Sequence, residues 1–371
     1  MRILHVSDCY APRTGGIETQ VRDLARAQVR AGHEVHVLTA TPGPAGERGG
    51  LVTEDDGVVV HRLAARLPFD LPVNPAAPPR MRRVVRGLAP DVVHVHAGVV
   101  SPFAYDGARV ARGERVPLAI TWHCMLDGMV PTLRAAARLG GWRGAPAALS
   151  AVSAAAAERV QGVFGVPVGV VPNGMDLEEW QPGPGEDAST LRCVATMRLA
   201  PRKRGPALIA VVEDAMTQLE PGQLTLEVLG DGPSRSTMAR RVRRRGLEAV
   251  VTLRGRVSRA DVRATYDHAD VFVAPAVLEA FGIAALEARA AGLVVVARRG
   301  TGIEEFITHG VDGLLVDDDA GMARALVRLA TQPRLLASLR GHARVHRPVQ
   351  GWRVTLAAVQ AEYARAAAQM V

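Results

Sequence analysis

Two glutamates and two cations have the types and spacing needed to bind a polar, phosphorylated ligand. Glu279 and Glu287 stand eight positions apart, and Arg198 and Lys203 stand five apart. Carboxylates accept hydrogen bonds and suit sugar hydroxyls, whereas fixed cations neutralise phosphate. The sequence therefore predicts that both kinds of side chain serve ligand binding.

The elements around the two glutamates are expected to hold them at the edge of a parallel sheet. Residues 269–274 (A-D-V-F-V-A) are typical of a buried strand, and the alanine- and leucine-rich run that follows favours a helix. Glu279, Phe281 and Gly282 fall in the turn, and Glu287 falls inside the helix. Ligands bind at this edge of open parallel sheets, where free N–H groups and the helix dipole attract anions.

A longer pattern surrounds the glutamate pair. Taken alone, E-x7-E is more often a helix cap and a solvated surface charge. The extended sequence E-A-F-G-I-x3-E-A-x-A-x-G-x-V-V-V-A resembles the signature of retaining glycosyltransferases of family four. This resemblance implies the GT-B fold, which is α/β with two Rossmann-like, doubly wound parallel-sheet domains facing a central cleft. It also implies transfer of a hexosyl group from a UDP- or GDP-linked sugar to a hydroxyl of a glycan, lipid or small-molecule acceptor.

The resemblance extends to residues 191–205, L-R-C-V-A-T-M-R-L-A-P-R-K-R-G. They are similar to the family's diphosphate clamp, usually written G-R-L-x-x-x-K-G. Met197 replaces the first glycine here, and Arg204 intervenes before the last one. The resemblance implies that Arg198 and Lys203 neutralise the leaving diphosphate.

The resemblance also implies a set of donor-binding residues. Glu279 would position the sugar, and Glu287 would hold the ribose. The residues implied to contact the nucleoside diphosphate sugar are Gly15, Gly16, Arg198, Lys203, Val257, Glu279, Phe281, Gly282, Ile283 and Glu287. No D-x-D pair accompanies these motifs, so we expect no metal and no cofactor besides the donor substrate.

The first half of the chain has the alternation of a doubly wound domain. Its expected strands cover residues 2–6, 34–39, 58–63, 91–96, 117–123, 149–152 and 169–172, with a helix at 19–31. Gly15 and Gly16 lie in the first strand-to-helix turn, where backbone N–H groups can reach a phosphate or sugar, although a plain tight turn is an equal alternative. They do not form G-x-G-x-x-G, which disfavours a nicotinamide dehydrogenase.

Three histidines lie in or beside strands of this half. His94 and His96 alternate on one strand without a third ligand nearby in the sequence, so we interpret them as core-edge or cleft residues. His123 ends a strand, where a histidine of the resembled family lies near the reacting sugar or acceptor. It could steady developing charge or orient the acceptor. The expected catalytic residues are Glu279, His123, Arg198 and Lys203.

The net charge is +8, from 45 basic and 37 acidic residues, and the excess gathers in two arginine-rich runs. Aromatic residues make up only 4% and no recognition motif accompanies the runs, so nucleic acid is disfavoured as a partner. The run at 240–245 is interpreted as a solvated helix face. Arg80, Arg82, Arg83 and Arg86 have helical spacing, which leaves open a peripheral contact with an anionic membrane or a phosphorylated acceptor.

The length of 371 residues favours two domains. We expect an acceptor domain at 1–178, joined by a C-terminal helix at 352–371, and a donor domain at 190–350, with a linker at 181–190. The three cysteines lack C-x-x-C spacing and are interpreted as reduced packing residues. Without an apolar span or a signal sequence, we expect a cytoplasmic protein, with the inner face of the membrane as an alternative location.

Two other functions stay open on sequence alone. A sugar-nucleotide epimerase or phosphorylase could use the same architecture, because fold does not fix chemistry. The basic runs also permit a non-catalytic protein that binds a nucleotide sugar or a membrane.

Overall fold

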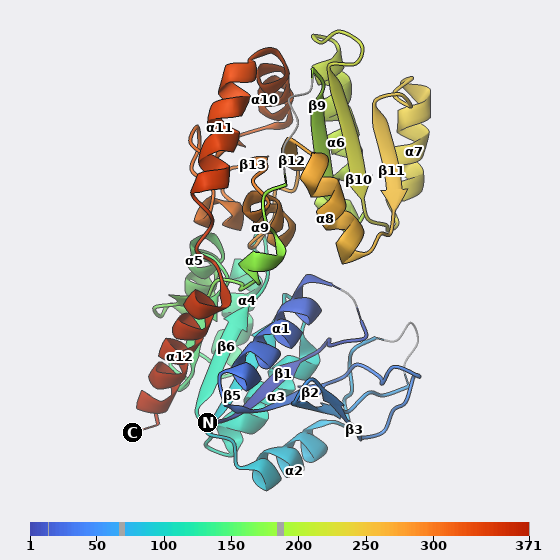
Figure 1. The fold of residues 1–371 in the computed structure, drawn as a ribbon. Helices are drawn as coiled ribbons and strands as arrows, with labels where there is room; N and C mark the ends of the chain where they lie inside the picture. The colour runs from blue at the N-terminus through green and yellow to red at the C-terminus, as the bar shows by residue number, and fades with distance from the viewer. Residues whose placement is uncertain (14, 67–70, 184–188, 371) are drawn as a thin grey trace. The chain divides into compact units, whose positions relative to one another are not determined.

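The chain forms two compact units in a computed structural model that describes residues 1–13, 15–66, 71–183 and 189–370. Unit 1 comprises Met1–Met175 and Gln350–Val371, and unit 2 comprises Asp176–Val349 (Figure 1). Each unit is built on its own largely parallel sheet. Residues 184–188 of the expected linker lie outside the described residues.

The sheet of unit 1 has the strand order β3-β4-β2-β1-β5-β6-β7-β8. The strands are β1 (Arg2–Ser7), β2 (Glu34–Thr39), β3 (Leu51–Asp55), β4 (Val58–Arg62), β5 (Val92–Ala97), β6 (Leu118–Trp122), β7 (Ala148–Ala151) and β8 (Gly169–Val170). All the predicted strands of this half form. The unpredicted strand, β3, pairs antiparallel with β4 at the sheet edge and leaves alternate side chains exposed, so no apolar run marks it.

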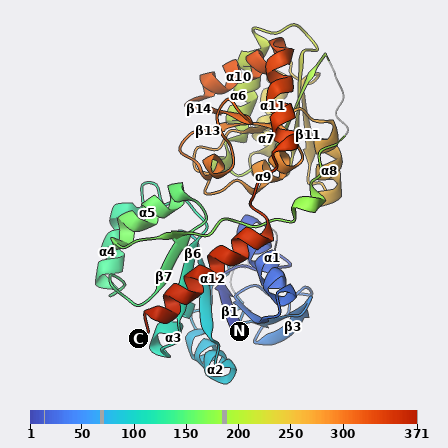
Figure 2. The same ribbon diagram turned by 60° about the vertical axis from the view of Figure 1, so that its left-hand side comes forward.

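Helices cover both faces of this sheet. They are α1 (Gly16–Arg30), α2 (Pro78–Leu88), α3 (Pro102–Gly113), α4 (Val130–Leu139), α5 (Ala154–Phe164) and α12 (Trp352–Ala368). The last helix, α12, lies beside α1 and packs on β6 and β7, as Figure 2 shows. On the opposite face, Gly107 of α3 rests against Val6. The helix expected at 19–31 begins three residues earlier, because the Gly15 carbonyl already accepts the Thr19 N–H.

The sheet of unit 2 is wholly parallel, with the order β11-β10-β9-β12-β13-β14. Its strands are β9 (Leu191–Thr196), β10 (Leu224–Leu229), β11 (Val251–Gly255), β12 (Val271–Ala274), β13 (Val294–Arg298) and β14 (Gly313–Val316). The order reverses between β9 and β12, where the chain continues to opposite sides of the sheet. Open α/β sheets bind ligands outside the carboxyl ends of the strands at such a switch point.

Among the residues of unit 2 that the structure describes, six helices and three short 3₁₀ turns accompany the sheet. The helices are α6 (Gly205–Met216), α7 (Arg235–Arg244), α8 (Arg259–His268), α9 (Ile283–Ala290), α10 (Asp319–Thr331) and α11 (Pro333–Val345). The turns are η2 (Leu177–Glu179), η3 (Pro201–Lys203) and η4 (Gly302–Glu305). The strands are apolar along most of their length, because helices cover both faces of the sheet.

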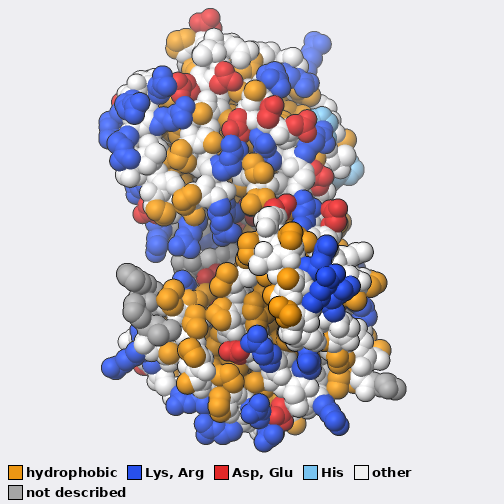
Figure 3. Space-filling model, turned by 180° about the vertical axis from the view of Figure 1, so that it is seen from behind, with side chains coloured by type: hydrophobic (Ala, Val, Ile, Leu, Met, Phe, Trp, Pro, Cys, Tyr) orange, Lys and Arg blue, Asp and Glu red, His pale blue; other side chains and the backbone are white. Residues whose placement is uncertain are grey.

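The surface of both units is rich in basic side chains. They gather over the edge of unit 2 that carries α7 and at the end of unit 1 that carries α2 (Figure 3). On α7, Arg241 pairs with Glu213, and the flanking Arg245 does the same. Among the described residues, no helix is both long and apolar enough to cross a membrane. Cys9, Cys124 and Cys193 are free thiols.

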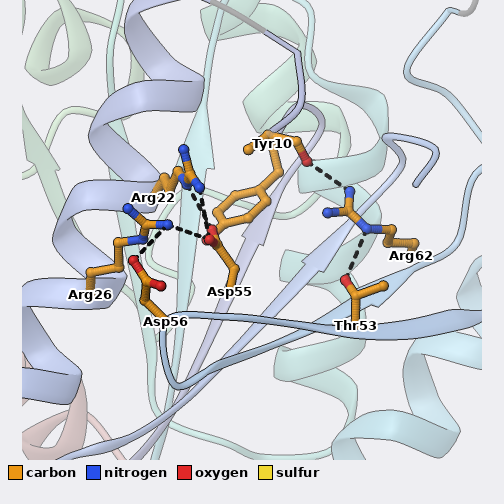
Figure 4. Close-up of polar contacts among 8 residues, drawn as sticks. Tyr10, Arg22, Arg26, Thr53, Asp55, Asp56 and Arg62 are labelled. Atoms are coloured by element: carbon orange, nitrogen blue, oxygen red, sulfur yellow. Dashed lines mark hydrogen bonds and ion pairs between the residues drawn. The ribbon is translucent and has the colours of Figure 1, made fainter. Parts of the chain in front are cut away.

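A polar cluster fastens the β3–β4 hairpin to α1 (Figure 4). Asp55 accepts two hydrogen bonds of 2.8 Å from Arg22, a further one from Arg26 and one of 3.0 Å from the Tyr10 hydroxyl. Burial opposes ionisation of Asp55, but the hydrogen bonds from Arg22, Arg26 and Tyr10 outweigh it and hold the pKa of this carboxyl well below its usual range.

Arg62 at the end of β4 fixes the neighbouring loops in the same region. It is 4% exposed and donates to the carbonyls of Ala11 at 2.8 Å and Pro42 at 3.1 Å. Its Nε also donates to Thr53 of β3 at 3.2 Å. The loops after β1 and β2 are thereby held at the carboxyl edge of the sheet.

Candidate active site

Three of the predicted donor-site residues of unit 2 follow the two strands at the switch point, β9 and β12. Arg198 follows β9 and is exposed, and Lys203 lies on η3 a few residues later. Glu279 lies in the turn after β12, and its carboxylate forms an ion pair with the Lys203 ammonium. Both side chains of this pair are less than a quarter exposed. The structure thus joins residues from the two predicted motifs.

Two glycines shape the turn that carries Glu279. Gly282 is the N-cap residue directly before α9, and its φ of 91° is a left-handed conformation that favours glycine. The Gly302 N–H donates to the Glu279 carbonyl at 2.8 Å, and a Cβ on Gly302 would lie 2.0 Å from the Ala280 carbonyl oxygen. The backbone of η4 therefore supports the turn directly, and this contact requires glycine.

Glu287 lies near the middle of α9, and two other predicted residues lie at or before the start of this helix. Glu287 lies 3.6 Å from Arg259 of α8, so the two glutamates of E-x7-E pair with different cations. Phe281 is buried against Phe306, and Ile283 is the first helical residue. The N–H groups of the first turn have no partner within the helix and can bind an anion. Val257 follows β11 and is half-buried.

Arg204, the departure from the usual clamp pattern, has a structural role. It forms a two-point ion pair with Asp319 at 2.8 and 2.7 Å and donates to the Pro275 carbonyl at 3.1 Å. These contacts tie the loop after β9 to the end of β12 and the start of α10. The hydrogen bond from Arg204 lowers the pKa of the Asp319 carboxyl.

One aspartate pair does have D-x-D spacing, contrary to the expectation that none accompanies the motifs. Asp317 and Asp319 follow β14. Asp318 between them caps α10, and Asp319 binds Arg298 at 3.0 Å as well as Arg204. Because Asp319 pairs with two arginines and Asp318 caps α10, we interpret residues 317–319 as structural.

In unit 1, the predicted residues lie at the carboxyl edge of the sheet. Gly15 and Gly16 form the start of α1 after the β1 loop. His123 follows β6, and its backbone N–H donates to the Ala97 carbonyl at 2.9 Å. Burial lowers the pKa of His123 to about 4, so its imidazole is neutral near pH 7. A neutral imidazole does not repel a developing positive charge and can form a hydrogen bond with a hydroxyl, so both expected roles stay predictions.

Asp8 is a residue at this edge that sequence reasoning missed. It follows β1, is 8% exposed and accepts the Phe103 N–H at 3.0 Å. Burial raises the pKa of its carboxyl to about 6. Its position directly after the first strand was the available signal, because side chains there reach the ligand-binding edge.

The interpretation of His94 and His96 as core-edge or cleft residues is wrong. Both are 2% exposed, and both lie inside the sheet of unit 1. The register of β1 with β5 brings His5 opposite His94, which supplies the third imidazole that the local sequence lacked. Ring nitrogens of His5, His94 and His96 lie within 4.8 Å of one another, and these three are the one metal-ligand cluster found among the described residues.

Two family models match the chain. Residues 14–179 match the model described as Glycosyltransferase Family 4, and residues 189–332 match the model described as Glycosyl transferases group 1. The two matches follow the two halves of the chain and together cover most of it.

Curated relatives match over nearly the full length. The chain is 28% identical to a D-inositol 3-phosphate glycosyltransferase of Pseudarthrobacter chlorophenolicus, over 97% of this chain and 93% of that protein. It is 27% identical to a GDP-mannose-dependent alpha-(1-6)-phosphatidylinositol monomannoside mannosyltransferase of Mycobacterium tuberculosis, over 85% of each chain.

Solved structures share the fold at low sequence identity. Anabaena Alr3699/HepE in complex with UDP and glucose superposes with a TM-score of 0.74 at 21% identity, covering 97% of this chain and 99% of that one. Sucrose-phosphate synthase from Thermosynechococcus elongatus gives 0.71 at 20% identity, covering 97% and 98%. The predicted GT-B fold is confirmed by these matches and by the two parallel sheets.

Proposed function

The chain belongs to glycosyltransferase family 4, and on this basis we propose that it transfers a hexosyl group from a UDP- or GDP-linked sugar to an acceptor that carries phosphate. It is a retaining glycosyltransferase that uses a nucleotide sugar. In this proposal unit 2 binds the donor and unit 1 binds the acceptor. The hexose and the nucleobase are the parts that the proposal leaves to experiment.

The arrangement at the switch point of unit 2 carries the proposal. Arg198 and Lys203 follow one central strand, and Glu279 and the start of α9 follow its neighbour. Cations and free N–H groups suit a diphosphate, and carboxylates suit the hydroxyls of a sugar and a ribose. One site thus offers partners for the diphosphate, the sugar and the ribose of a nucleoside diphosphate sugar.

The chemistry we propose follows from those partners. The bond between the anomeric carbon and the diphosphate breaks, and the diphosphate leaves with the electron pair. Arg198, Lys203 and the first N–H groups of α9 stabilise its charge, as preorganised donors do in a transition state. The acceptor hydroxyl attacks from the same face, and its proton passes to a diphosphate oxygen. Glu279 positions the sugar, and Glu287 holds the ribose.

The acceptor is proposed from the relatives. One relative acts on D-inositol 3-phosphate and another on a phosphatidylinositol monomannoside, according to their names. Both acceptors combine a cyclitol with phosphate. We infer that this chain glycosylates an inositol phosphate or a lipid that bears one.

Turnover assays with product analysis test this function. GDP- and UDP-linked hexoses are screened by thermal shift, because a ligand at a hundred times its Kd stabilises a protein by about 3 kcal/mol. The stabilising donor is then combined with inositol phosphate and phosphatidylinositol. An α-linked product from an α-linked donor, seen by NMR, supports the proposal, and an inverted anomer contradicts it. Conversion of the donor without any acceptor would indicate an epimerase or phosphorylase.

A membrane contact through α2 extends the proposal for a lipid acceptor. All four arginines of α2 are exposed, but Arg82 and Arg86 both pair with Glu114. Among the described residues, Arg80 and Arg83 have no carboxylate partner. These two are therefore the arginines expected to attract anionic lipid, each contributing about 1 kcal/mol near the membrane.

Vesicle co-sedimentation at two salt concentrations tests the contact. Arg80→Gln with Arg83→Gln should abolish binding to vesicles of phosphatidylglycerol and phosphatidylcholine, whereas Arg82→Gln with Arg86→Gln should weaken it less. Binding should fall with added salt. Equal, negligible binding to anionic and neutral vesicles would favour an acceptor that is free in solution over one in a membrane.

A further inference from the structure

Four histidines line one face of the unit 1 sheet. His5 lies on β1, His94 and His96 on β5, and His123 directly after β6. Adjacent strands place them side by side, with ring centroids 4.2 to 5.2 Å apart. His5, His94 and His96 are almost wholly buried, and His123 is half-buried at the carboxyl edge. The row therefore runs from the sheet interior to the edge that holds the predicted site residue.

Hydrogen bonds link three of these rings to α1. Nε2 of His123 lies 3.0 Å from Nδ1 of His96, and Nε2 of His96 lies 2.9 Å from Nδ1 of His5. Nε2 of His5 lies 2.6 Å from the side-chain oxygen of Gln28. His5 and His96 thus use both ring nitrogens.

The same chain of hydrogen bonds continues through the C-terminal helix. The Gln28 amide donates to the Tyr363 hydroxyl of α12 at 3.0 Å, and that hydroxyl lies 3.0 Å from Nδ1 of His94. Nε2 of His94 lies 2.8 Å from the Thr121 hydroxyl. That hydroxyl meets Ser150 at 2.8 Å, and Ser150 donates to the carbonyl of Ile120 at 3.4 Å.

A backbone carbonyl at the far end gives this chain a direction. Burial lowers the pKa of His5 and His123 to about 4 and holds those of His94 and His96 well below the usual range, so each ring carries one proton at pH 7. A neutral imidazole has one donor and one acceptor, and a carbonyl only accepts. With Ser150 donating to the carbonyl, every earlier group must donate to the next one.

Tracing the donors back from Ser150 to the carboxyl edge of the sheet assigns the ring proton of His123. Thr121 donates to Ser150, His94 donates through Nε2, and Tyr363 donates to His94. The amide nitrogen of Gln28 then faces Tyr363, which leaves its oxygen to accept from His5. His96 must donate through Nε2 to His5, and His123 must donate through Nε2 to His96.

We propose that this chain holds His123 as the neutral Nε2–H tautomer, so that Nδ1 offers a lone pair to a hydroxyl of the bound substrate. The proposal rests on the proposed function only for the identity of that substrate. His5, Gln28, His96 and Tyr363 become positioning residues, which act on the reaction through His123. The C-terminal helix contributes to the site in this way without touching substrate.

The cluster of His5, His94 and His96 could instead bind a metal ion, and the hydrogen bonds decide against that. A metal needs the lone pair of each ligand. In the assigned chain the lone pair of His5 accepts from His96, that of His94 accepts from Tyr363, and that of His96 accepts from His123. All three lone pairs are therefore used by hydrogen bonds within unit 1.

NMR of ¹⁵N-histidine-labelled protein tests the proposal without any substrate. Long-range ¹H–¹⁵N spectra distinguish a protonated ring nitrogen from one with a lone pair, and His123→Gln assigns the signal. In the wild type at pH 7, His123 should show protonated Nε2 and unprotonated Nδ1. His96→Phe removes its acceptor, and Tyr363→Phe lets the Gln28 amide reverse, so both variants should shift the signal towards a mixture of tautomers.

Tyr10→Phe is the matched control, because it removes a hydroxyl of the same unit that bonds Asp55 instead of the chain. It should leave the His123 signal unchanged. Tyr363→Phe should also lower kcat several-fold with little change in the KM for donor. A His123 signal that shows Nδ1–H in the wild type overturns the proposal, and so does a signal that both chain variants leave unchanged from the wild type. One equivalent of zinc in the purified protein, lost in His96→Phe, would overturn it too.

The outcomes separate this proposal from the proposed function. A protein with the Nε2–H tautomer that transfers no sugar contradicts the function and supports the chain. A protein that transfers sugar while His123 carries its proton on Nδ1 contradicts the chain and supports the function.

Discussion

At the scale of single residues, Lys203 and Glu279 hold each other in place. Their ion pair joins the loop after β9 to the turn after β12. Removing one partner of a partly buried pair leaves the other charge without compensation. The two motifs therefore act as one unit, and substitutions in either should affect the other.

We expect Lys203→Ala and Arg198→Ala each to lower kcat about 10²- to 10³-fold, the loss typical of one group that stabilises transition-state charge. Arg202→Ala is the control, since Arg202 lies exposed on the same η3 turn. Steady-state kinetics and thermal unfolding measure the effects, and the melting temperatures should stay close to that of the wild type. Full activity in both variants would refute the roles assigned to these cations.

The two glutamates should have separable effects. Glu287→Gln should weaken binding of the free nucleoside diphosphate by about 1.5–3 kcal/mol, the value of a hydrogen bond to a charged group. Glu279→Gln should slow transfer more than it weakens that binding. Titration calorimetry beside turnover measures both, and the reverse pattern would mean that their roles are exchanged.

The sequence predicted these site residues but not their partners. Family spacing marked Arg198, Lys203, Glu279 and Glu287, because motif residues lie close together in the chain. The ion pair of Lys203 with Glu279 joins residues 76 positions apart, and Gln28 meets Tyr363 across 335 positions. Such contacts depend on the strand order, which local patterns do not contain.

At the scale of elements, the apolar strands were predictable from the sequence, but the edge strand β3 was not. Every predicted strand forms, because buried parallel strands are nearly continuous apolar runs. β3 escaped prediction, since three of its five residues, Thr53, Glu54 and Asp55, are polar. Its stability comes from the Asp55 cluster and from pairing with β4.

The Asp55 cluster should make stability depend on pH. The folded pKa of Asp55 is depressed relative to its ordinary value near 4, so its contribution is present above about pH 4 and is lost as the pH falls towards the folded pKa. Asp55→Asn should lower the free energy of unfolding by about 2 kcal/mol at pH 7. Urea unfolding from pH 3 to pH 7 should show the difference from the wild type shrinking below pH 4. A difference that is constant over this range would argue against the ion pairs.

Gly302→Ala tests the support of the catalytic turn by η4. The added Cβ would overlap the Ala280 carbonyl, so the turn must move and Glu279 with it. Activity should fall by at least tenfold, as a shift of about 1 Å can do. Gly300→Ala is no control because of its positive φ, whereas Gly341→Ala in α11 has open space and should keep wild-type activity. Unchanged turnover in Gly302→Ala would show that η4 does not hold the turn that carries Glu279.

At the scale of the whole molecule, charge neutralisation by the protein should replace a metal. We propose that Arg198, Lys203 and the N-terminus of α9 neutralise the diphosphate, and Asp319 of the D-x-D pair is bound by Arg204 and Arg298. Activity should therefore be the same in EDTA as in magnesium. Loss of activity in EDTA that a divalent ion restores would contradict the assignment.

The placement of α12 has a consequence for how the protein is made on the ribosome. Unit 1 consists of Met1–Met175 and Gln350–Val371, and α12 of the second segment brings Tyr363 to the amide of Gln28 on α1. Domains usually fold as they are synthesised. Here the sequence of unit 2 is complete while unit 1 still lacks Tyr363. The buried imidazole of His94 in unit 1 therefore lacks a hydrogen-bond partner at that stage. The half that is synthesised first is therefore the half that matures last, and chains that end at residue 349 and are released from the ribosome should display a protease-resistant unit 2 beside a protease-sensitive unit 1.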